Sequence, residues 1–457
     1  MGAQKITELG TESIRKLLIK YALPGIIAMT AMSLYNMVDS IFIGHGVGAL
    51  ALSGLTVAKP FMDICAAFGT LVGIGASSLV AIKLGEKDYR SANDILANVI
   101  LLNVLLGSMI MVVGLYFLDP ILYAFGASDE TIVYARDYME IILWGNILTH
   151  IYYGLNSMLR SAGHPRISMY ATILAVTLNI ALDPIFIFVL DMGVRGAALA
   201  TILSQLVAVI LELIIFLNPK EVLHFHRGIW RLKRDITMRA LSIGLAPFLM
   251  HMAACFVVIV LNNQLKRYGG DMAIATFGMT NRFMFFFSMI VMGIQQGMQP
   301  IVGYNYGSQQ YPRMLRAYRL SVYCATFVMG ALFLFGVLFP EGFIRLFTHD
   351  DLLIAQSIAP ARIMLCVMFM VGFSMITGNF YTSIGMPSKA IFLSLTRQVL
   401  YLIPLILLLP HLFDNMGWEP IMGVWWALPI SDTMATMTAA YMVKKDIQKF
   451  KKTASTE

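Results

Sequence analysis

Residues 75–89, GASSLVAIKLGEKDY, return 222 positions later as residues 297–311, GMQPIVGYNYGSQQY. A second segment, SAGHPR from Ser161, returns at the same offset as SIGMPS from Ser383. Gly75, Gly85, Tyr89, Gly163 and Pro165 correspond to Gly297, Gly307, Tyr311, Gly385 and Pro387. Shared helix-end chemistry is an alternative source of such Gly and Pro matches. Two distant segments that share an offset of nearly half the chain indicate two like halves. A third match, Leu23-Pro24 with Ala246-Pro247, needs an offset of 223.

The composition indicates a membrane protein. Apolar residues make up 58% of the 457, charged residues 13%, and the mean hydropathy is +0.74. Apolar runs of about 20 residues recur, each long enough to cross the bilayer as a helix, and the alternating strands of an outer-membrane barrel are absent. We predict twelve transmembrane helices, at about 17–40, 58–80, 95–118, 137–160, 168–190, 196–217, 240–262, 273–300, 319–340, 357–380, 389–410 and 421–443.

The basic residues predict the orientation. With the N-terminus inside, 24 Lys and Arg fall on the cytoplasmic side and seven on the outer side, while Arg282 and Arg397 lie within spans. This asymmetry is the one that the positive-inside rule describes, so both termini are expected in the cytoplasm. The net charge of +7 is therefore a topology signal, and nucleic acid is not an expected partner because the basic residues are spread over short loops.

The expected fold class is an all-α integral membrane protein with two six-helix lobes. An even number of spans in each half makes the repeats parallel, related by a pseudo-two-fold axis along the membrane normal. We expect an N-lobe at 1–218, a cytoplasmic linker at 219–239 and a C-lobe at 240–457. Two like halves favour a transporter, and the chain contains no GxxxxGK[ST] run to indicate an ATPase.

Cysteine and histidine predict neither disulfides nor a metal centre. The four cysteines, Cys65, Cys255, Cys324 and Cys366, are isolated within apolar spans and fit small core residues. His224, His226 and His251 lack a Cys or carboxylate that would complete a ligand set. The basic linker that carries the first two fits an amphipathic connector at the level of the lipid headgroups better than a metal site.

Acids within spans are the strongest indication of chemistry, because a carboxylate in the bilayer must be paired, protonated or hydrated. Asp39 lies in span 1 and Asp183 in span 5, both in the outer half of the membrane. Asn179 precedes Asp183 by one helical turn, and Thr201 in span 6 lies at a similar depth. These four residues form a candidate site for H⁺ or Na⁺. The alternative is that each acid only ends its helix near the outer headgroups.

The second half does not repeat these acids. Asp39 corresponds to Asn262 and Asp183 to Leu405, so ion coupling is expected in the first half only. Asp432, near the middle of span 12, is the exception that would overturn this expectation. Glu212 lies near the inner end of span 6, where its side chain is expected to reach the membrane surface.

The candidate substrate-binding residues are Met32, Tyr35, Asn156, Arg282 and Met289. Met32 and Tyr35 share one helical face with Asp39, and the 32 methionines of the chain suit a binder of varied hydrophobic molecules. Arg282 either fixes helix packing or contacts substrate. Pro24, near the cytoplasmic end of span 1, is a candidate hinge or a static kink.

The chain resembles the multidrug and toxic compound extrusion (MATE) family over essentially its whole length. The resemblance rests on Pro24 with YNMVDSIFIG, GASSLVAIKLGEKD, SAGHPR with LNIALDP, QQGMQPIVGYNYGS and SIGMPS. It implies a V of two lobes, alternating access, a working monomer and export driven by H⁺ or Na⁺, without an organic cofactor. Where members of the family have an N-lobe cation site, its positions match Asp39, Asn179, Asp183 and Thr201. Other members use a Glu in span 7, which this chain lacks.

The expected function is therefore secondary active export of lipophilic or cationic compounds across a bacterial or archaeal plasma membrane. The main alternative is a flippase of lipid-linked saccharides, which would need a more cationic cavity than Arg282 and Arg397 provide. An enzyme within the membrane would need a catalytic constellation in the spans, and none is evident. A channel would need a filter-like segment, which is also missing.

Overall fold

The computed structural model of the protein describes residues 2–225, 232–345 and 350–456, and within these ranges it consists of helices and their connections. The first half contains α1 (Gly2–Thr11), α2 (Ile14–Gly46), α3 (Ala49–Gly85), α4 (Tyr89–Tyr116), α5 (Leu118–Ala124), α6 (Ile132–Trp144), α7 (Asn146–Ser161), α8 (Pro165–Pro184), η1 (Ile185–Val189) and α9 (Gly193–Phe216). The second half contains α10 (Arg234–Gly307), α11 (Tyr311–Leu338), α12 (Pro340–Ile344), α13 (Asp351–Leu365), α14 (Met368–Ser383), α15 (Pro387–Leu395), η2 (Thr396–Leu402), α16 (Ile403–Asn415) and α17 (Pro420–Thr456).

The predicted twelve spans correspond to these helices once their breaks are considered. Eight described helices are long and apolar enough to cross a membrane, and the bent pair α13–α14 brings the number to nine. The other three crossings are α17, the pair α6–α7, and the second limb of α10, which turns back at Gly270 with φ 65°. The predicted loop between spans 7 and 8 is therefore helical, and the chain reverses at Gly270 alone. Glycine allows this tight turn because it adopts a positive φ without a steric penalty.

The internal repeat is visible in the backbone. Lys87 and Gln309, which are 222 residues apart, both have positive φ, at 61° and 60°, and so do Gly163 and Gly385, at 87° and 67°. In each half the first turn separates two long helices, and the second precedes a helix that begins with proline. Proline favours the first helical position because its φ is already helical and the missing N–H has no partner to lose there. The sequence match therefore reflects a repeated fold.

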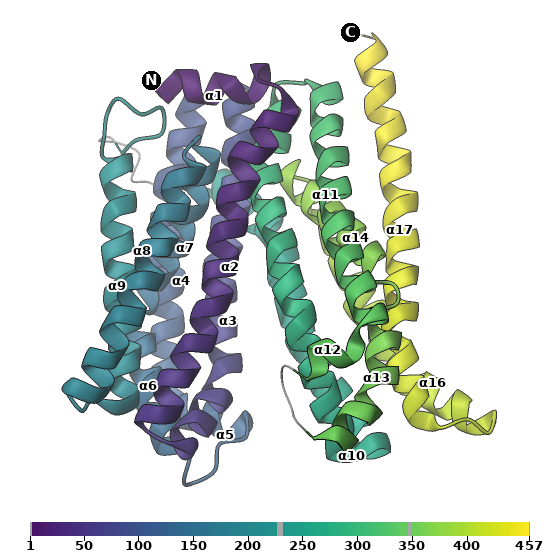
Figure 1. Cartoon of the computed structure of the whole chain (residues 1–457). Helices are drawn as coiled ribbons and strands as arrows, with labels where there is room; N and C mark the ends of the chain where they lie inside the picture. The colour runs from purple at the N-terminus through teal and green to yellow at the C-terminus, as the bar shows by residue number, and fades with distance from the viewer. Residues whose placement is uncertain (1, 226–231, 346–349, 457) are drawn as a thin grey trace.

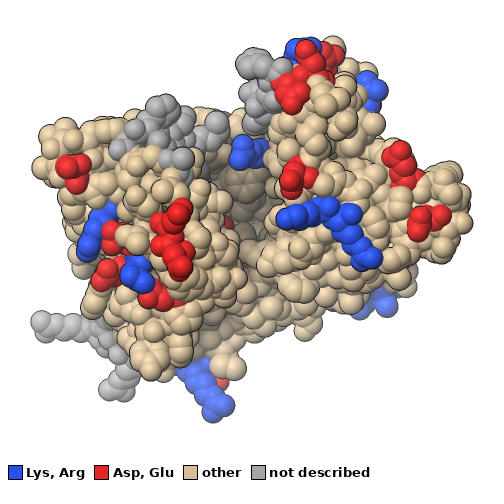
Figure 2. Space-filling view, turned by 90° about the horizontal axis from the view of Figure 1, so that it is seen from below, with Lys and Arg blue, Asp and Glu red and all other residues tan. Residues whose placement is uncertain are grey.

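The two lobes form a V (Figure 1). They meet at the end of the molecule where both chain termini lie, here called the termini end, and they diverge toward the opposite, open end. Viewed from the open end, the space-filling surface is hollowed between the lobes (Figure 2). The predicted architecture of two six-helix lobes is confirmed, whereas the exact boundaries at 218 and 240 stay a prediction.

Glycines bring the lobes into backbone contact at the termini end. A Cβ on Gly85 would lie 2.1 Å from the carbonyl oxygen of Tyr304, and a Cβ on Gly307 would lie 2.1 Å from that of Ile82. Gly307 and Tyr304 are the repeat equivalents of Gly85 and Ile82, so the two contacts are related by the pseudo-two-fold axis. Such an approach excludes every residue with a side chain.

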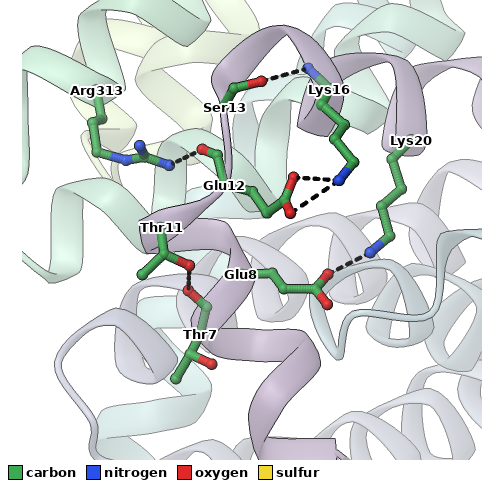
Figure 3. Close-up of polar contacts among 8 residues, drawn as sticks. All are labelled: Thr7, Glu8, Thr11, Glu12, Ser13, Lys16, Lys20 and Arg313. Carbon is green, nitrogen blue, oxygen red and sulfur yellow. Dashed lines mark hydrogen bonds and ion pairs between the residues drawn. The ribbon is translucent and has the colours of Figure 1, made fainter.

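The N-terminal helix reinforces this contact from the termini end (Figure 3). Arg313 of the C-lobe donates from Nη2 to the carbonyl oxygen of Glu12 at 2.6 Å and to that of Leu9 at 3.2 Å. Within the N-lobe, Ser13 caps α2 by accepting from the Lys16 N–H, and Lys20 pairs with Glu8. Helix α1 thus joins α2 to the C-lobe.

The linker is bound to the N-lobe where it is described. The His224 N–H donates to Asn93 Oδ1 at 2.8 Å, and the Lys233 N–H donates to Asn98 Oδ1 at 3.1 Å. Lys233 Nζ also pairs with Asp94. The three acceptors lie on α4, so the chain enters α10 from a fixed position on the N-lobe.

Candidate cation and substrate site

The structure brings the four predicted cation-site residues together. When the Asn179 amide is oriented so that both of its atoms are satisfied, its nitrogen donates to Asp183 Oδ2 at 3.0 Å. Its oxygen then accepts from the Thr201 N–H at 3.0 Å and from the Thr201 hydroxyl at 3.2 Å. Asp39 and Asp183 lie within hydrogen-bonding reach of each other. Helices α2, α8 and α9 therefore converge on one oxygen-rich position.

The carboxyl pair has capacity for a cation. Asp183 is fully buried, and one oxygen of each acid, Oδ1 of Asp39 and Oδ1 of Asp183, is buried without a hydrogen-bond partner. A hydrogen bond between two carboxyl groups requires a proton on one of them, and a buried unpaired carboxylate oxygen is costly. Protonation or a bound Na⁺ would satisfy these oxygens, because both ions suit carboxylate and hydroxyl ligands.

Two tyrosines enclose this position. The Tyr35 hydroxyl lies 3.4 Å from Thr201 Oγ1, so the face of α2 that was expected to bind substrate turns Tyr35 toward the cation site. Tyr138 of α6 is buried, and its hydroxyl group faces Thr201. Sequence reasoning missed Tyr138. Its position in the first turns of span 4 places it at the depth of Asp39, which is the signal that could have identified it.

Asp432 has a partner within the C-lobe. The Arg397 Nε donates to Asp432 Oδ1 at 2.5 Å, which links η2 to α17, and Asp432 is buried. At the positions that correspond to Asp39 and Asp183, the C-lobe has Asn262 and Leu405, so neither acid is repeated there.

Two charges that were expected at the membrane surface lie inside the N-lobe. Glu212 does not reach the headgroups: it is fully buried and accepts from Asn156 Nδ2 at 2.9 Å. Arg160, which the predicted topology places at the cytoplasmic end of span 4, belongs to the last turn of α7 and is also buried. The expectation for Glu212 was wrong because proximity to a helix end does not determine which face of the helix meets lipid. Here that face packs against α7 and α8.

The other candidate substrate residues are dispersed. Asn156 is enclosed by α7, α8 and α9 and bonds Arg160, Ser168 and Glu212, so the structure does not place it between the lobes. Its predicted contact with substrate is untested, as are those of Met32 and Met289, which are half-buried. Arg282 is exposed.

Pro24 is buried within a continuous α2, and the neighbouring Gly25 lies against Gly293 of the other lobe. A Cβ on Gly25 would be 2.7 Å from the Gly293 carbonyl oxygen. The predicted hinge therefore sits at the contact between the lobes, where a bend would change their separation. Its bending stays a prediction.

The histidines of the described chain do not assemble a metal centre. His164 Nε2 lies 3.0 Å from Glu221 Oε2, and His224 Nδ1 lies 2.8 Å from the Glu221 carbonyl oxygen. No group of three or more His, Cys, Asp or Glu side chains that could hold a metal occurs among the described residues. His226 lies outside them.

The fold is that of a two-lobed membrane transporter with a buried acid pair in one lobe, and comparison with known proteins specifies its family. The MatE family model matches residues 24–185 and 242–407, so the chain belongs to the MATE family. The resemblance seen in the sequence is thereby confirmed.

Relatives and solved structures agree along the whole chain. The multidrug export protein MepA of Staphylococcus aureus (strain MRSA252) is 27% identical over 431 residues, covering 94% of this chain and 93% of that protein. The MATE multidrug transporter DinF-BH, solved as a ligand complex, is 38% identical with a TM-score of 0.88, covering 96% and 97% of the two chains. A MATE structure in the bent conformation is 25% identical with a TM-score of 0.91, covering 100% and 99%.

Proposed function

We propose that this protein exports lipophilic and cationic small molecules across the plasma membrane in exchange for H⁺ or Na⁺, with the coupling ion bound at Asp39, Asn179, Asp183 and Thr201. The observation that carries the proposal is the buried carboxyl pair, in which one oxygen of each acid has no partner. The similarity to MepA, a multidrug export protein, and to DinF-BH, a multidrug transporter, supports the class of substrate.

The proposed orientation places both termini in the cytoplasm, as the distribution of Lys and Arg indicates. The open end of the V then faces outward, and the conformation described is outward-open. The contacts of Gly85 with Tyr304 and of Arg313 with α1 close the cytoplasmic side in this state. They must separate when the lobes rock toward the inward-open state.

In the proposed cycle the ion and the substrate exclude each other. An ionised Asp39–Asp183 pair favours an organic cation in the hollow, and H⁺ or Na⁺ arriving from outside neutralises the pair and releases that cation outward. The lobes then rock, the ion leaves to the cytoplasm, and new substrate enters. Because binding coupling is reciprocal, each ligand weakens the affinity for the other, typically by about 5–150-fold.

The contacts give the flippase alternative no support. A site for a lipid-linked pyrophosphate needs several unpaired cations in the central cavity. Of the two arginines considered, Arg397 is paired with Asp432, which leaves Arg282 alone.

Ethidium transport by purified protein in liposomes tests the proposal. A pH or Na⁺ gradient is expected to drive ethidium accumulation in the wild type, and Asp39→Asn and Asp183→Asn are expected to reduce driven transport at least about tenfold, within the usual range of coupling. Glu130→Gln, which removes an exposed acid in the α5–α6 connection, is the matched control and should transport normally. Gradient-driven transport at the wild-type rate by a folded Asp183→Asn variant would contradict the proposed coupling site.

A further inference from the structure

The N-lobe contains a second buried polar cluster near the termini end, which the cycle above does not use. It is enclosed by α7, α8 and α9. Arg160 Nη1 donates to Asn156 Oδ1 at 2.5 Å and to Ser168 Oγ at 3.0 Å, and Asn156 Nδ2 donates to Glu212 Oε1 at 2.9 Å. The Asn156 amide thus lies between the guanidinium and the carboxyl group and binds both.

Glu212 is incompletely satisfied in this cluster. The residue is 0% exposed, and its Oε2 is buried without a hydrogen-bond partner. Among the described residues, the charged and titratable groups that face it are Arg160 and Tyr152, both on α7, whereas α8 contributes the hydroxyls of Ser168 and Thr172. A buried carboxylate with a free oxygen is costly, and a proton on Oε2 lowers that cost because it removes the charge.

Polar side chains lie between this cluster and the cation site. On α9, Thr201 belongs to the cation site, Ser204 follows one turn later and Glu212 two turns beyond that. The Ser204 hydroxyl is buried without a partner. On the facing side of α8, Asn179 of the cation site and Thr172 of the cluster are about 10 Å apart at 1.5 Å per residue. By the same measure Thr201 and Glu212 are about 16 Å apart.

We propose that Glu212 is a second proton-binding group, through which the proton leaves the Asp39–Asp183 pair toward the termini end. This inference rests on the proposed function. An O–H bond breaks at Asp183 and one forms at Glu212 Oε2, relayed by the Thr201 and Ser204 hydroxyls and intervening water. The proton then passes to the solvent at the termini end. The site suits H⁺ and not Na⁺, because Arg160 repels a metal cation and only one carboxylate oxygen is free.

Glu212→Gln tests the proposal, since the amide keeps the size of the side chain but cannot carry the proton. In ethidium-transporting liposomes, pH-driven accumulation by Glu212→Gln is expected to fall at least about tenfold, within the usual range of coupling. Ethidium exchange without a gradient should stay near the wild-type rate. Glu212→Asp keeps a titratable group and should retain both activities. Glu86→Gln, an exposed acid at the end of α3, is the matched control.

The outcomes separate the two proposals. Wild-type pH-driven transport by Glu212→Gln beside an inactive Asp183→Asn overturns this inference alone. Parallel loss of driven transport and of exchange in both Glu212 variants overturns it in favour of a packing role. A wild type that transports ethidium under a Na⁺ gradient at equal pH overturns the assignment to H⁺. A wild type that responds to neither gradient overturns the proposed function and this inference with it.

Discussion

At the scale of single residues, charges inside the lobes are held by one or two specific partners. Asp432 is 4% exposed and accepts from Arg397, whereas Glu212 is approached by Arg160 only through Asn156. The Asp39–Asp183 pair has no cation beside it at hydrogen-bonding distance among the described residues. The three sites thus range from a satisfied ion pair to an acid pair that needs an ion, which is the property expected of a coupling site.

Removing Arg397 tests whether the Arg397–Asp432 ion pair stabilises the fold, unlike the Asp39–Asp183 pair, which is proposed to bind the coupling ion. Arg397→Met leaves Asp432 buried without its partner, so we expect the protein to lose about 3–5 kcal/mol of stability. Thermal unfolding in detergent measures the loss. The double variant Arg397→Met/Asp432→Leu should recover most of it, since no charge remains to be compensated. A single variant as stable as the wild type would show that Asp432 does not depend on Arg397.

At the scale of helices, Asp446 ties three elements of the C-lobe together beyond the predicted end of span 12. Lys389 Nζ of α15 donates to Asp446 Oδ2 at 2.6 Å, and the Tyr381 hydroxyl of α14 donates to the same oxygen at 2.7 Å. Burial raises the pKa of Asp446, but the hydrogen bonds from Lys389 and Tyr381 and the Lys389 charge lower it more, so the pKa lies below its ordinary value of 3.8. The ionised form therefore stabilises the fold.

The pH dependence of this stabilisation follows from its sign. With a folded-state pKa below the unfolded one, the contribution is complete above the unfolded value and is lost as the pH falls through the folded value. We expect Asp446→Asn to reduce the stability at pH 7 by about 1–3 kcal/mol, the usual effect of losing such hydrogen bonds. The free energies of unfolding of variant and wild type should converge as the pH falls below 3.8. A difference that keeps its size at every pH below 3.8 would contradict an ionised Asp446.

At the scale of the whole molecule, the conformation depends on how closely two lobes approach at one end. The Gly85–Tyr304 and Gly307–Ile82 contacts are backbone to backbone and are related by the pseudo-two-fold axis. Gln299 adds a bond across the interface, from Nε2 to Ser78 Oγ at 2.7 Å. Small residues at this surface allow the lobes to close tightly while only a few polar bonds must break for them to separate.

A side chain at Gly85 should therefore change the conformation of the transporter. Gly85→Val places its Cβ where Tyr304 has its carbonyl oxygen, so we expect the lobes to separate at the termini end and approach at the open end. Spin labels at Ser128 and Asp414, in a variant without the four native cysteines, should report a shorter distance across the open end. Ethidium transport should fall about tenfold, as for a population shift of about 1.4 kcal/mol.

Gly330→Val is the matched control, because a Cβ at that helical glycine meets nothing within 4 Å. It should leave the label distance and ethidium transport unchanged. An unchanged distance in Gly85→Val would show that the close approach of the lobes at this glycine does not set the separation of the lobes at the open end.

The sequence by itself determined the twelve spans, the duplication and the membership of one polar cluster in the N-lobe. These follow from hydropathy, from glycine and proline at fixed positions, and from the depth of polar residues along a helix, which are all local properties. It also placed Asp39, Asn179, Asp183 and Thr201 at one level, and the helices bring them into contact.

Only the tertiary structure decided which polar residues are partners. Arg160 and Glu212 lie at helix ends in the sequence and inside the lobe in the structure, while Asp432 is paired with an arginine 35 residues away. The rotation of each helix about its axis decides whether such a residue meets lipid, water or a neighbouring helix. That rotation is set by the packing of all the helices together, so no local pattern in the chain reveals it.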